Sequence, residues 1–347
     1  MLFPYVRKSI VPLLTLLLSA TILSACGGTS HNAASPSPSP PSASPTPSQT
    51  ESPAATESSS PVASKPAVRS YKDALDRIVE IPTVPQRIIA HYYAAEMTAL
   101  DVPIVGTNFV NAKLALTEVQ LQGVEDVGGD GIVPNLEKTL SLEPDLIIVP
   151  DFLKEADLEA LSKIAPTVVV GYGADALTRL GVLAELIGQP EKAKDWIARY
   201  EAKAAEKREL VQSSIDKGET ASAFILYSDK QFYVYNKQRL GPTLYDALGF
   251  AIPPKVTELF ADKPDELWEA ISIEKLPDYA GDRVFLISQN STDEGKKAAE
   301  DLLQGPVWKN LAAIHNGKAY VVDSHWAMND PLTLDWLLDE MASLLAR

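Results

Sequence analysis

Cysteine and histidine are scarce in this chain of 347 residues, which contains one cysteine and four histidines. The lone cysteine, Cys26, cannot form an intrachain disulfide. A zinc site would need several histidines or carboxylates at strand ends, and only His91 and His325 follow predicted strands. We therefore expect neither a disulfide framework nor a bound metal.

Catalytic motifs are also missing from the sequence. It contains no nucleophile beside its base, no glycine-rich phosphate loop after a predicted strand, and no helix with paired metal-binding histidines. We therefore predict that the chain is not an enzyme and carries no cofactor. A metal-chelatase-like enzyme on a related two-lobed fold is the alternative from a different class.

Basic residues are outnumbered, because 31 lysines and arginines face 46 aspartates and glutamates, giving a formal net charge of -15. The phosphates of nucleic acid would be repelled at long range, so we exclude nucleic acid as a partner. With 46% hydrophobic residues the chain can form sizeable hydrophobic cores, and its length favours about two domains. We expect a monomer.

Residues 1–25 are predicted to be a lipoprotein signal peptide. Arg7 and Lys8 form its charged start, and the apolar run that follows is too short to span a bilayer comfortably. Its end, Leu23-Ser-Ala-Cys26, resembles the bacterial lipobox, in which the cysteine becomes the lipidated first residue of the mature protein. The alternative is an ordinary signal peptide that is cleaved elsewhere and leaves Cys26 free.

Residues 26–66 are predicted to be the lipidated Cys26 followed by a disordered spacer. The segment is rich in serine and proline and has almost no large apolar side chain, so burial cannot offset the entropy of ordering it. A proline-rich chain of this length reaches on the order of 100 Å. We therefore predict a lipid anchor at the extracellular face of a cell membrane of the Gram-positive type.

The stretch 175–215 separates two halves of similar design. It carries two helical patterns, the first ending at Gly188 with Pro190 just beyond it. On both sides, short apolar runs alternate with amphipathic helices, which is typical of parallel α/β sheets. We predict an α/β fold of two lobes, each with a central, mostly parallel sheet flanked by helices, joined by a long helix. The predicted domain bounds are 67–174 for the N-terminal lobe, 175–189 for the joining helix and 190–347 for the C-terminal lobe.

Several short segments carry the patterns of single elements. Strands are expected at 76–82, 85–91, 104–106, 168–170, 223–227, 232–235 and 283–288, with one more ending at 149 and one ending at 323. Helices are expected at 94–100, 244–250 and 334–345, and from Ser272 onwards.

Three blocks of sequence resemble one known family. They are Pro85-x-Arg-Ile-Ile89, the pair Pro134-Asn-Leu-Glu137 and Pro144-Asp-Leu-Ile147, and the final block from Trp308 through Asn316-Gly317 to a last strand. In this order they are similar to the periplasmic-binding-protein family of iron–siderophore, haem and cobalamin ABC importers, over residues 70–347. The family's usual Leu-Gly-Val is Leu100-Asp-Val102 here. The resemblance implies the class III fold of that family.

Candidate ligand contacts lie just past the predicted strands, because ligands of open α/β sheets sit at the carboxyl ends of strands. Several of them are aromatic, as a large and partly apolar ligand requires. The candidates in the first half are His91, Tyr92, Tyr93, Asn108, Phe109, Asp151, Phe152 and Tyr172. The resemblance adds Trp326 as a stacking aromatic. Cations near these loops are Lys113, Arg179, Lys230, Lys237 and Arg239, and the planar fork of Arg179 makes it the preferred donor, with Lys230 as the second.

The resemblance implies a substrate-binding protein that captures a ferric siderophore and delivers it to an ABC permease. A siderophore surrounds its iron with its own oxygens, so the protein needs aromatic walls and a few cationic donors rather than metal ligands. Haem and cobalamin remain alternatives. For haem, His91, Tyr92 or Tyr93 could supply an axial ligand.

Glu137 and Glu274 occupy equivalent places in the two halves. Each lies two residues after a helix-capping residue and shortly before a Pro-Asp pair and a strand. They resemble the family's pair of acidic residues that dock onto arginines of the two permease subunits. The alternative is that each only interacts with the positive end of its helix dipole.

Overall fold

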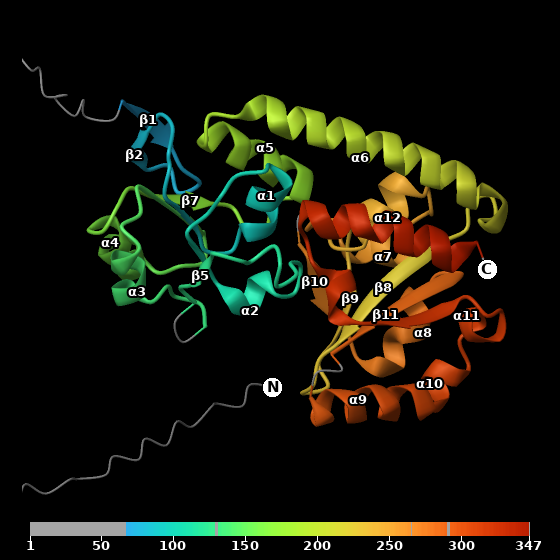
Figure 1. Ribbon diagram of the computed structural model, residues 1–347. Coiled ribbons are helices and arrows are strands. Elements are labelled where there is room, and N and C mark those ends of the chain that lie inside the picture. The colour runs from blue at the N-terminus through green and yellow to red at the C-terminus, as the bar shows by residue number, and fades with distance from the viewer. Residues whose placement is uncertain (1–66, 129–130, 265, 290–291, 347) are drawn as a thin grey trace, which may run out of the picture. The chain divides into compact units, whose positions relative to one another are not determined.

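The computed structural model describes residues 67–128, 131–264, 266–289 and 292–346. The predicted signal peptide, Cys26 and the spacer up to residue 66 lie outside these ranges. In the described part, two five-stranded sheets lie in separate halves of the chain (Figure 1). None of its helices has the length and apolar character that crossing a membrane requires.

The N-terminal sheet has five parallel strands in the order β5-β4-β3-β6-β7. Strand β6 is buried along its whole length, as expected for a parallel strand that is covered on both faces. The elements of this lobe are β1 (Val68–Lys72), β2 (Ile78–Pro82), β3 (Ile88–Ala90), α1 (Ala94–Ala99), β4 (Gly106–Thr107), α2 (Phe109–Ala112), β5 (Glu125–Asp126), α3 (Leu136–Ser141), β6 (Leu146–Pro150), α4 (Glu155–Ser162) and β7 (Thr167–Val170).

The C-terminal sheet has the order β10-β9-β8-β11-β12, and its last three strands are parallel. Strands β9 and β10 run antiparallel at the edge. The elements are β8 (Ala221–Leu226), β9 (Phe232–Tyr235), the π-helical turn η2 (Pro242–Ala247), α7 (Pro254–Leu259), β10 (Trp268–Ala270), the 3-10 turn η3 (Ile273–Lys275), α8 (Leu276–Tyr279), β11 (Arg283–Ser288), α9 (Asp293–Gln304), α10 (Pro306–Lys309), α11 (Ala312–His315), β12 (Ala319–Val322), the 3-10 turn η4 (Ser324–Ala327) and α12 (Pro331–Leu345).

Two consecutive helices, α5 (Ala176–Leu186) and α6 (Pro190–Val211), lead from one sheet to the other, and the 3-10 turn η1 (Gln212–Ser214) follows them. Asp175 starts α5 by accepting hydrogen bonds from two backbone amides of its first turn. Gly188, with φ of 74°, ends it in the left-handed conformation that glycine adopts without strain. The long helix of the fold is α6, with 22 residues, rather than the predicted joining segment 175–189.

Helices α6 and α12 tie the two hydrophobic cores together. Ala193 and Trp196 of α6 belong to the core of the N-terminal lobe, whereas Val211 at the other end of α6 belongs to the core of the C-terminal lobe. Within α12, Leu334 packs into the first core and Leu337 into the second. Because α6 and α12 each contribute side chains to both cores, these two helices hold the two lobes together.

The predicted two-lobed α/β fold with mostly parallel sheets and a long connecting helix is confirmed. Three local predictions differ. The strand predicted at 104–106 lies at Gly106–Thr107, and the helix predicted at 244–250 is a π-helical turn. The helix predicted from Ser272 begins as a 3-10 turn, and α8 starts only at Leu276, where Pro277 fits the first turn.

Candidate functional site

Three aromatic side chains of the N-terminal lobe meet at the carboxyl edge of its sheet. Tyr92, Phe152 and Tyr172 each come two residues after the end of a strand, and the three strands β3, β6 and β7 are neighbours. The ring centroids lie 5.4 Å apart for Tyr92 and Phe152, 5.7 Å for Tyr92 and Tyr172, and 5.4 Å for Phe152 and Tyr172. All three pairs have edge-to-face geometry, which aromatic pairs favour. We call these three predicted residues the aromatic triad.

A second aromatic group lies in the C-terminal lobe, around β9 and the edge strand β10. Tyr227, Tyr233 and Trp268 are half-buried, with ring centroids 5.1 to 5.9 Å apart. We call them the C-lobe cluster. The sequence analysis missed this group, although one signal was present. Tyr233 and Tyr235 are two residues apart on one strand face, where large aromatic side chains gather.

The two aromatic groups are within electrostatic reach of each other. Burial raises the pKa of Tyr227 above its ordinary value, and the nearby hydroxyl of Tyr172 contributes to the same shift. The positive charge of Arg239 opposes this shift. The backbone of Arg239 has a φ of 62°, and its buried Nε has no hydrogen-bond partner among the described residues. Arg239 is therefore a cation that acts electrostatically on the C-lobe cluster and whose Nε is unpaired within the described part of the chain.

Two predicted contacts, His91 and Tyr93, are fully buried and face the protein interior. Nε2 of His91 lies 2.8 Å from the carbonyl oxygen of Ile132. Burial lowers the pKa of His91 to about 4, so the imidazole is neutral at neutral pH. The Tyr93 hydroxyl donates a hydrogen bond of 2.8 Å to the carbonyl oxygen of Val170. Both predicted contacts are therefore buried and hydrogen-bonded within the protein in this structure.

Asn108 and Trp326 are also internal, against expectation. Asn108 caps α2 by accepting a hydrogen bond from the amide of Asn111, because a helix start leaves its first amides unpaired. Trp326 is only 8% exposed, and its ring stacks on Phe285 and meets the edge of Trp336. The indole therefore belongs to the core of the C-terminal lobe rather than to a ligand-stacking surface.

The burial of Trp326 makes a testable prediction about stability. We expect Trp326→Ala to lower the free energy of unfolding by about 3–5 kcal/mol, because it removes a large buried ring and leaves a cavity. Chemical denaturation measures this change. Phe152→Ala is the matched control, since that ring is 44% exposed and its loss should change stability by less than about 1 kcal/mol. If the Trp326→Ala protein were as stable as the parent, Trp326 would not be a core residue, and it would again be a candidate ligand contact.

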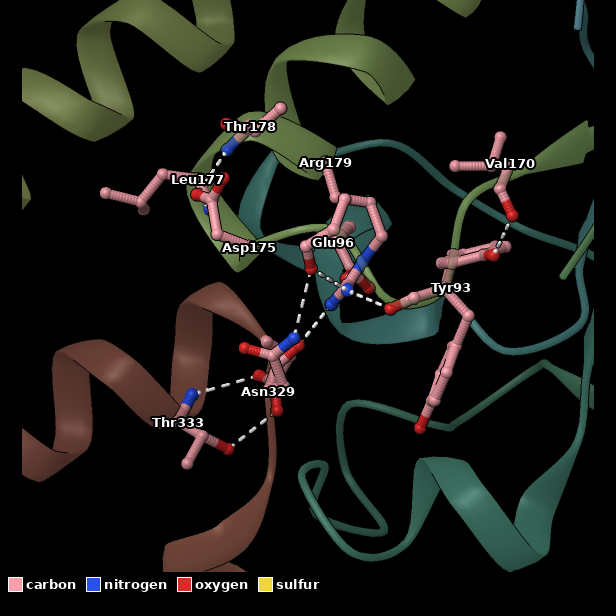
Figure 2. A network of polar contacts seen from close by, with 12 residues as sticks. Tyr93, Glu96, Val170, Asp175, Leu177, Thr178, Arg179, Asn329 and Thr333 are labelled. Atoms are coloured by element: carbon pink, nitrogen blue, oxygen red, sulfur yellow. Dashed lines mark hydrogen bonds and ion pairs between the residues drawn. The ribbon is translucent and has the colours of Figure 1, made fainter. Parts of the chain in front are cut away.

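Arg179, the preferred cationic donor, is also committed to the protein itself. Its side chain is 3% exposed, and Nε and Nη2 lie 2.7 and 2.6 Å from Oε1 of Glu96. Nη1 donates to the carbonyl oxygens of Tyr172 and Ala174, and Nη2 donates to that of Asn329 (Figure 2). Because each end of the guanidinium fork has a partner, the structure does not support Arg179 as a ligand donor.

Lys230 and Phe109 lie at the surface in different surroundings. Lys230, in the turn between β8 and β9, forms an ion pair of 3.0 Å with Asp301. Both side chains are exposed, so this pair contributes little to stability. Phe109 is half-buried, and the ammonium of Lys113 lies 5.1 Å from its ring centroid. Among the described residues, the Phe109 ring forms no ring pair with the aromatic triad, and the Lys230 ammonium lies over none of the three rings.

The described residues contain no group of three or more histidine, cysteine or acidic side chains that could hold a metal ion. A cavity of about 790 Å³ is lined by residues 173–177 at the start of α5, by α6 and by residues around η2. None of the aromatic triad, the C-lobe cluster or Arg239 lines it.

Glu137 and Glu274 are both exposed and both lie in the first turn of a helical segment. Asn135 caps the helix of Glu137. The backbone amide of Glu274 and the hydroxyl of Ser272 lower the pKa of the Glu274 carboxyl, so it remains ionised at neutral pH. The equivalence seen in the sequence is therefore kept, although Glu274 lies in a 3-10 turn instead of an α-helix.

Comparison with known proteins adds a family match. A family model described as "Periplasmic binding protein" matches residues 107–325. The chain is 32% identical over 276 residues to the iron(3+)-hydroxamate-binding protein FhuD of Bacillus subtilis (strain 168), covering 78% of this chain and 84% of that protein. It is 27% identical over 278 residues to the probable siderophore-binding lipoprotein YfiY of the same organism, covering 77% and 83% respectively.

A solved structure gives the same result for the fold. FhuD2 from Staphylococcus aureus with bound ferrioxamine B is 29% identical to this chain, with a TM-score of 0.63. The match covers 76% of this chain and 98% of that one. The similarity therefore extends over nearly the whole of a ligand-binding relative.

Proposed function

The chain belongs to the periplasmic binding protein family, and from this premise we propose that it captures a ferric siderophore, with hydroxamates as the first class, for an ABC importer. Members of this family bind a substrate without transforming it, so the chain is a binding protein and not an enzyme. Relatives named for ferric hydroxamate and for ferrioxamine B support the choice of ligand class.

The observation that carries the proposal is the pair of aromatic groups together with Arg239, whose Nε has no hydrogen-bond partner among the described residues. The aromatic triad lies on one lobe, and the C-lobe cluster with Arg239 lies on the other. A siderophore supplies all the oxygens around its iron, and its outer surface offers apolar carbon and carbonyl oxygens. Aromatic rings and one or two guanidinium or ammonium donors suit such a surface.

We assign the ligand wall to the aromatic triad and the C-lobe cluster, with Arg239 in place of Arg179 as the donor to siderophore oxygens. Phe109 and Lys230 stay as peripheral contacts. The haem alternative is weakened, because His91 and Tyr93 are buried and hydrogen-bonded within the protein. Only Tyr92 of the predicted axial ligands remains half-exposed.

A fluorescence titration tests the ligand class. Trp268 lies in the proposed wall, so ferric hydroxamate should quench its emission in a saturable way. A ferric catecholate, a ferric carboxylate siderophore, haem and cobalamin complete the panel. Trp268→Phe is the control, because it should remove most of the signal and keep most of the affinity. Saturable binding of haem or cobalamin alone would contradict the proposal.

We further propose that Glu137 and Glu274 dock the loaded protein onto a two-fold permease. Both carboxylates are exposed, and each lobe presents one of them at the start of a helical segment. Charges at the rim of an interface set register and association rate, and two related permease subunits would read two equivalent charges.

We also propose that Cys26 carries lipid and anchors the protein at the extracellular face of the membrane. The lipobox-like end of the predicted signal peptide supports this placement, as does a relative that is named a lipoprotein. We expect intact-mass analysis of membrane-extracted protein to show a mature chain that starts at diacylated Cys26. Cys26→Ser is expected to release the protein into the medium. A mature start elsewhere, or an unmodified Cys26, would contradict the anchor.

A further inference from the structure

One buried arginine connects three segments that lie far apart in the sequence. Arg179 of α5 pairs with Glu96 of α1, and it donates to the carbonyl oxygens of Tyr172 after β7 and of Asn329 before α12 (Figure 2). Arg179 and Glu96 are only 3% and 1% exposed. Burial raises the pKa of Glu96, while Arg179 opposes this and favours the ionised carboxylate.

This network reaches the aromatic triad directly. Nη1 of Arg179 donates a hydrogen bond of 2.9 Å to the backbone of Tyr172, and Cζ lies 5.8 Å from the centroid of the Tyr172 ring. The amide of Asn329 donates to the carbonyl oxygen of Ala174, which also accepts from Arg179. The loop that carries Tyr172 is therefore held from two sides.

The same network extends to helix α12, which packs into both lobes. Asp330, the residue after Asn329, caps α12 by accepting hydrogen bonds from the amide and hydroxyl of Thr333. Further along α12, Leu337 belongs to the core of the C-terminal lobe. A small cavity of about 20 Å³ lies between this network and the rings of Tyr92 and Tyr172. Arg179 thus links the loop of Tyr172 in the N-terminal lobe to the start of α12. Helix α12 also packs into the core of the C-terminal lobe.

We propose that Arg179 is a positioning residue that fixes Tyr172 against the start of α12, so that the ligand wall is assembled before the ligand arrives. The proposal rests on the proposed siderophore-binding function and deepens it. A preformed wall binds more tightly because fewer side chains must be ordered on binding. The planar fork of arginine is required, since an ammonium cannot serve Glu96, Tyr172 and Asn329 at once.

A second buried ion pair supplies a matched control. Arg283 pairs with Glu219 at 2.9 Å, the two are 5% and 1% exposed, and the guanidinium lies over the rings of Phe250 and Tyr320. Arg283 is the first residue of β11, at the edge of the sheet opposite to its carboxyl end. Arg283→Lys therefore removes the same chemistry from a buried pair without touching either aromatic group.

The test compares Arg179→Lys with Arg283→Lys at a temperature where both proteins are folded. We expect Arg179→Lys to weaken binding of a ferric hydroxamate about tenfold, mainly through faster dissociation, which is the effect of leaving one or two side chains to be ordered on binding. Arg283→Lys should change affinity less than about twofold while lowering the melting temperature by a similar amount. Glu96→Gln, which keeps the shape of the acceptor, is the second variant if Arg179→Lys does not fold.

A ligand-free readout separates this inference from the proposed function. Hydrogen exchange of the backbone amides of residues 172–174 and of Asn329 and Asp330 should accelerate in Arg179→Lys and stay unchanged in Arg283→Lys. If the parent protein binds no ferric siderophore, the proposed function fails, and the exchange result still decides the positioning role. Equal affinity losses in both lysine variants, or unchanged exchange in Arg179→Lys, would overturn the proposal.

Discussion

Removing two rings of the aromatic triad, by Tyr92→Ala combined with Tyr172→Ala, is expected to weaken ferric hydroxamate binding about 100-fold. The centroids of the two rings lie 5.7 Å apart in edge-to-face geometry, and the rings form the centre of the proposed wall. Truncating a central aromatic contact typically costs about 1–2 kcal/mol or more, and two such losses correspond to about two orders of magnitude in Kd. Calorimetric titration of the parent and the double variant measures the change.

The control for this prediction is a tyrosine at the other end of α5. Tyr71 of β1 lies beside Arg69, which donates to the carbonyl oxygens of Glu185 and Leu186 in the last turn of α5. Tyr172 lies before the first turn of the same helix, about 16 Å away along its axis by the rise per residue. Tyr71→Ala should therefore leave the affinity unchanged. An unchanged Kd in the double variant would exclude the triad as the binding wall.

Replacing both docking carboxylates, by Glu137→Ala with Glu274→Ala, is expected to reduce siderophore-dependent iron uptake by cells at least about tenfold, since paired rim charges set the association with a partner. Ligand affinity should stay at the parent value, because neither residue takes part in the aromatic groups. The melting temperature should change little, since a carboxylate near a helix start contributes only about 0.3–1 kcal/mol. Uptake of radioactive iron measures the main effect.

Two other glutamates match this pair in chemistry. Glu155 is an exposed residue in the first turn of α4, and Glu294 is an exposed residue in the first turn of α9. Glu155→Ala with Glu294→Ala removes the same interaction with a helix dipole from each lobe. Full uptake in this control and loss in the docking variant would support docking. Equal behaviour of the two double variants would leave only the helix-capping interpretation.

The triad was predictable because strand geometry decides it. In a parallel sheet the carboxyl ends of neighbouring strands meet at one edge, so aromatic residues after three strands are brought together. Both Tyr92 and Tyr93 were predicted as contacts, and that Tyr93 is buried while Tyr92 stays half-exposed was not predictable in the same way. The two are adjacent, and only the direction in which α1 leaves β3 decides that Tyr93 turns inward to Val170.

For Arg179, the sequence contained a signal that was not used. Ala176, Leu180 and Leu183 form the buried stripe of α5, and Arg179 lies on this stripe at helical spacing. A charged residue on a buried stripe needs a buried partner, which Glu96 of α1 supplies. Which distant segment supplies that partner depends on tertiary packing, so the sequence pattern predicts the need and not the pair.

The C-lobe cluster depends on a long connection that sequence spacing does not reveal. Trp268 lies opposite Tyr235 only because β10 returns to pair antiparallel with β9. More than thirty residues separate the two, including the π-helical turn and α7. The whole sheet determines which strands pair over such a distance. The sequence therefore shows these aromatic residues, but it does not predict that Trp268 packs against the tyrosines of β9.

The central claim is that the protein recognises the outer surface of a siderophore and supplies no ligand to its metal. The most direct test is a calorimetric comparison of one hydroxamate siderophore loaded with Fe³⁺, loaded with Ga³⁺, and free of metal, together with an inorganic Fe³⁺ salt held soluble by a weak chelator. The account predicts 1:1 binding of the Fe³⁺ and Ga³⁺ complexes with equal affinity, and no binding of iron from the salt. Binding of the bare iron, or of neither siderophore complex, would contradict it.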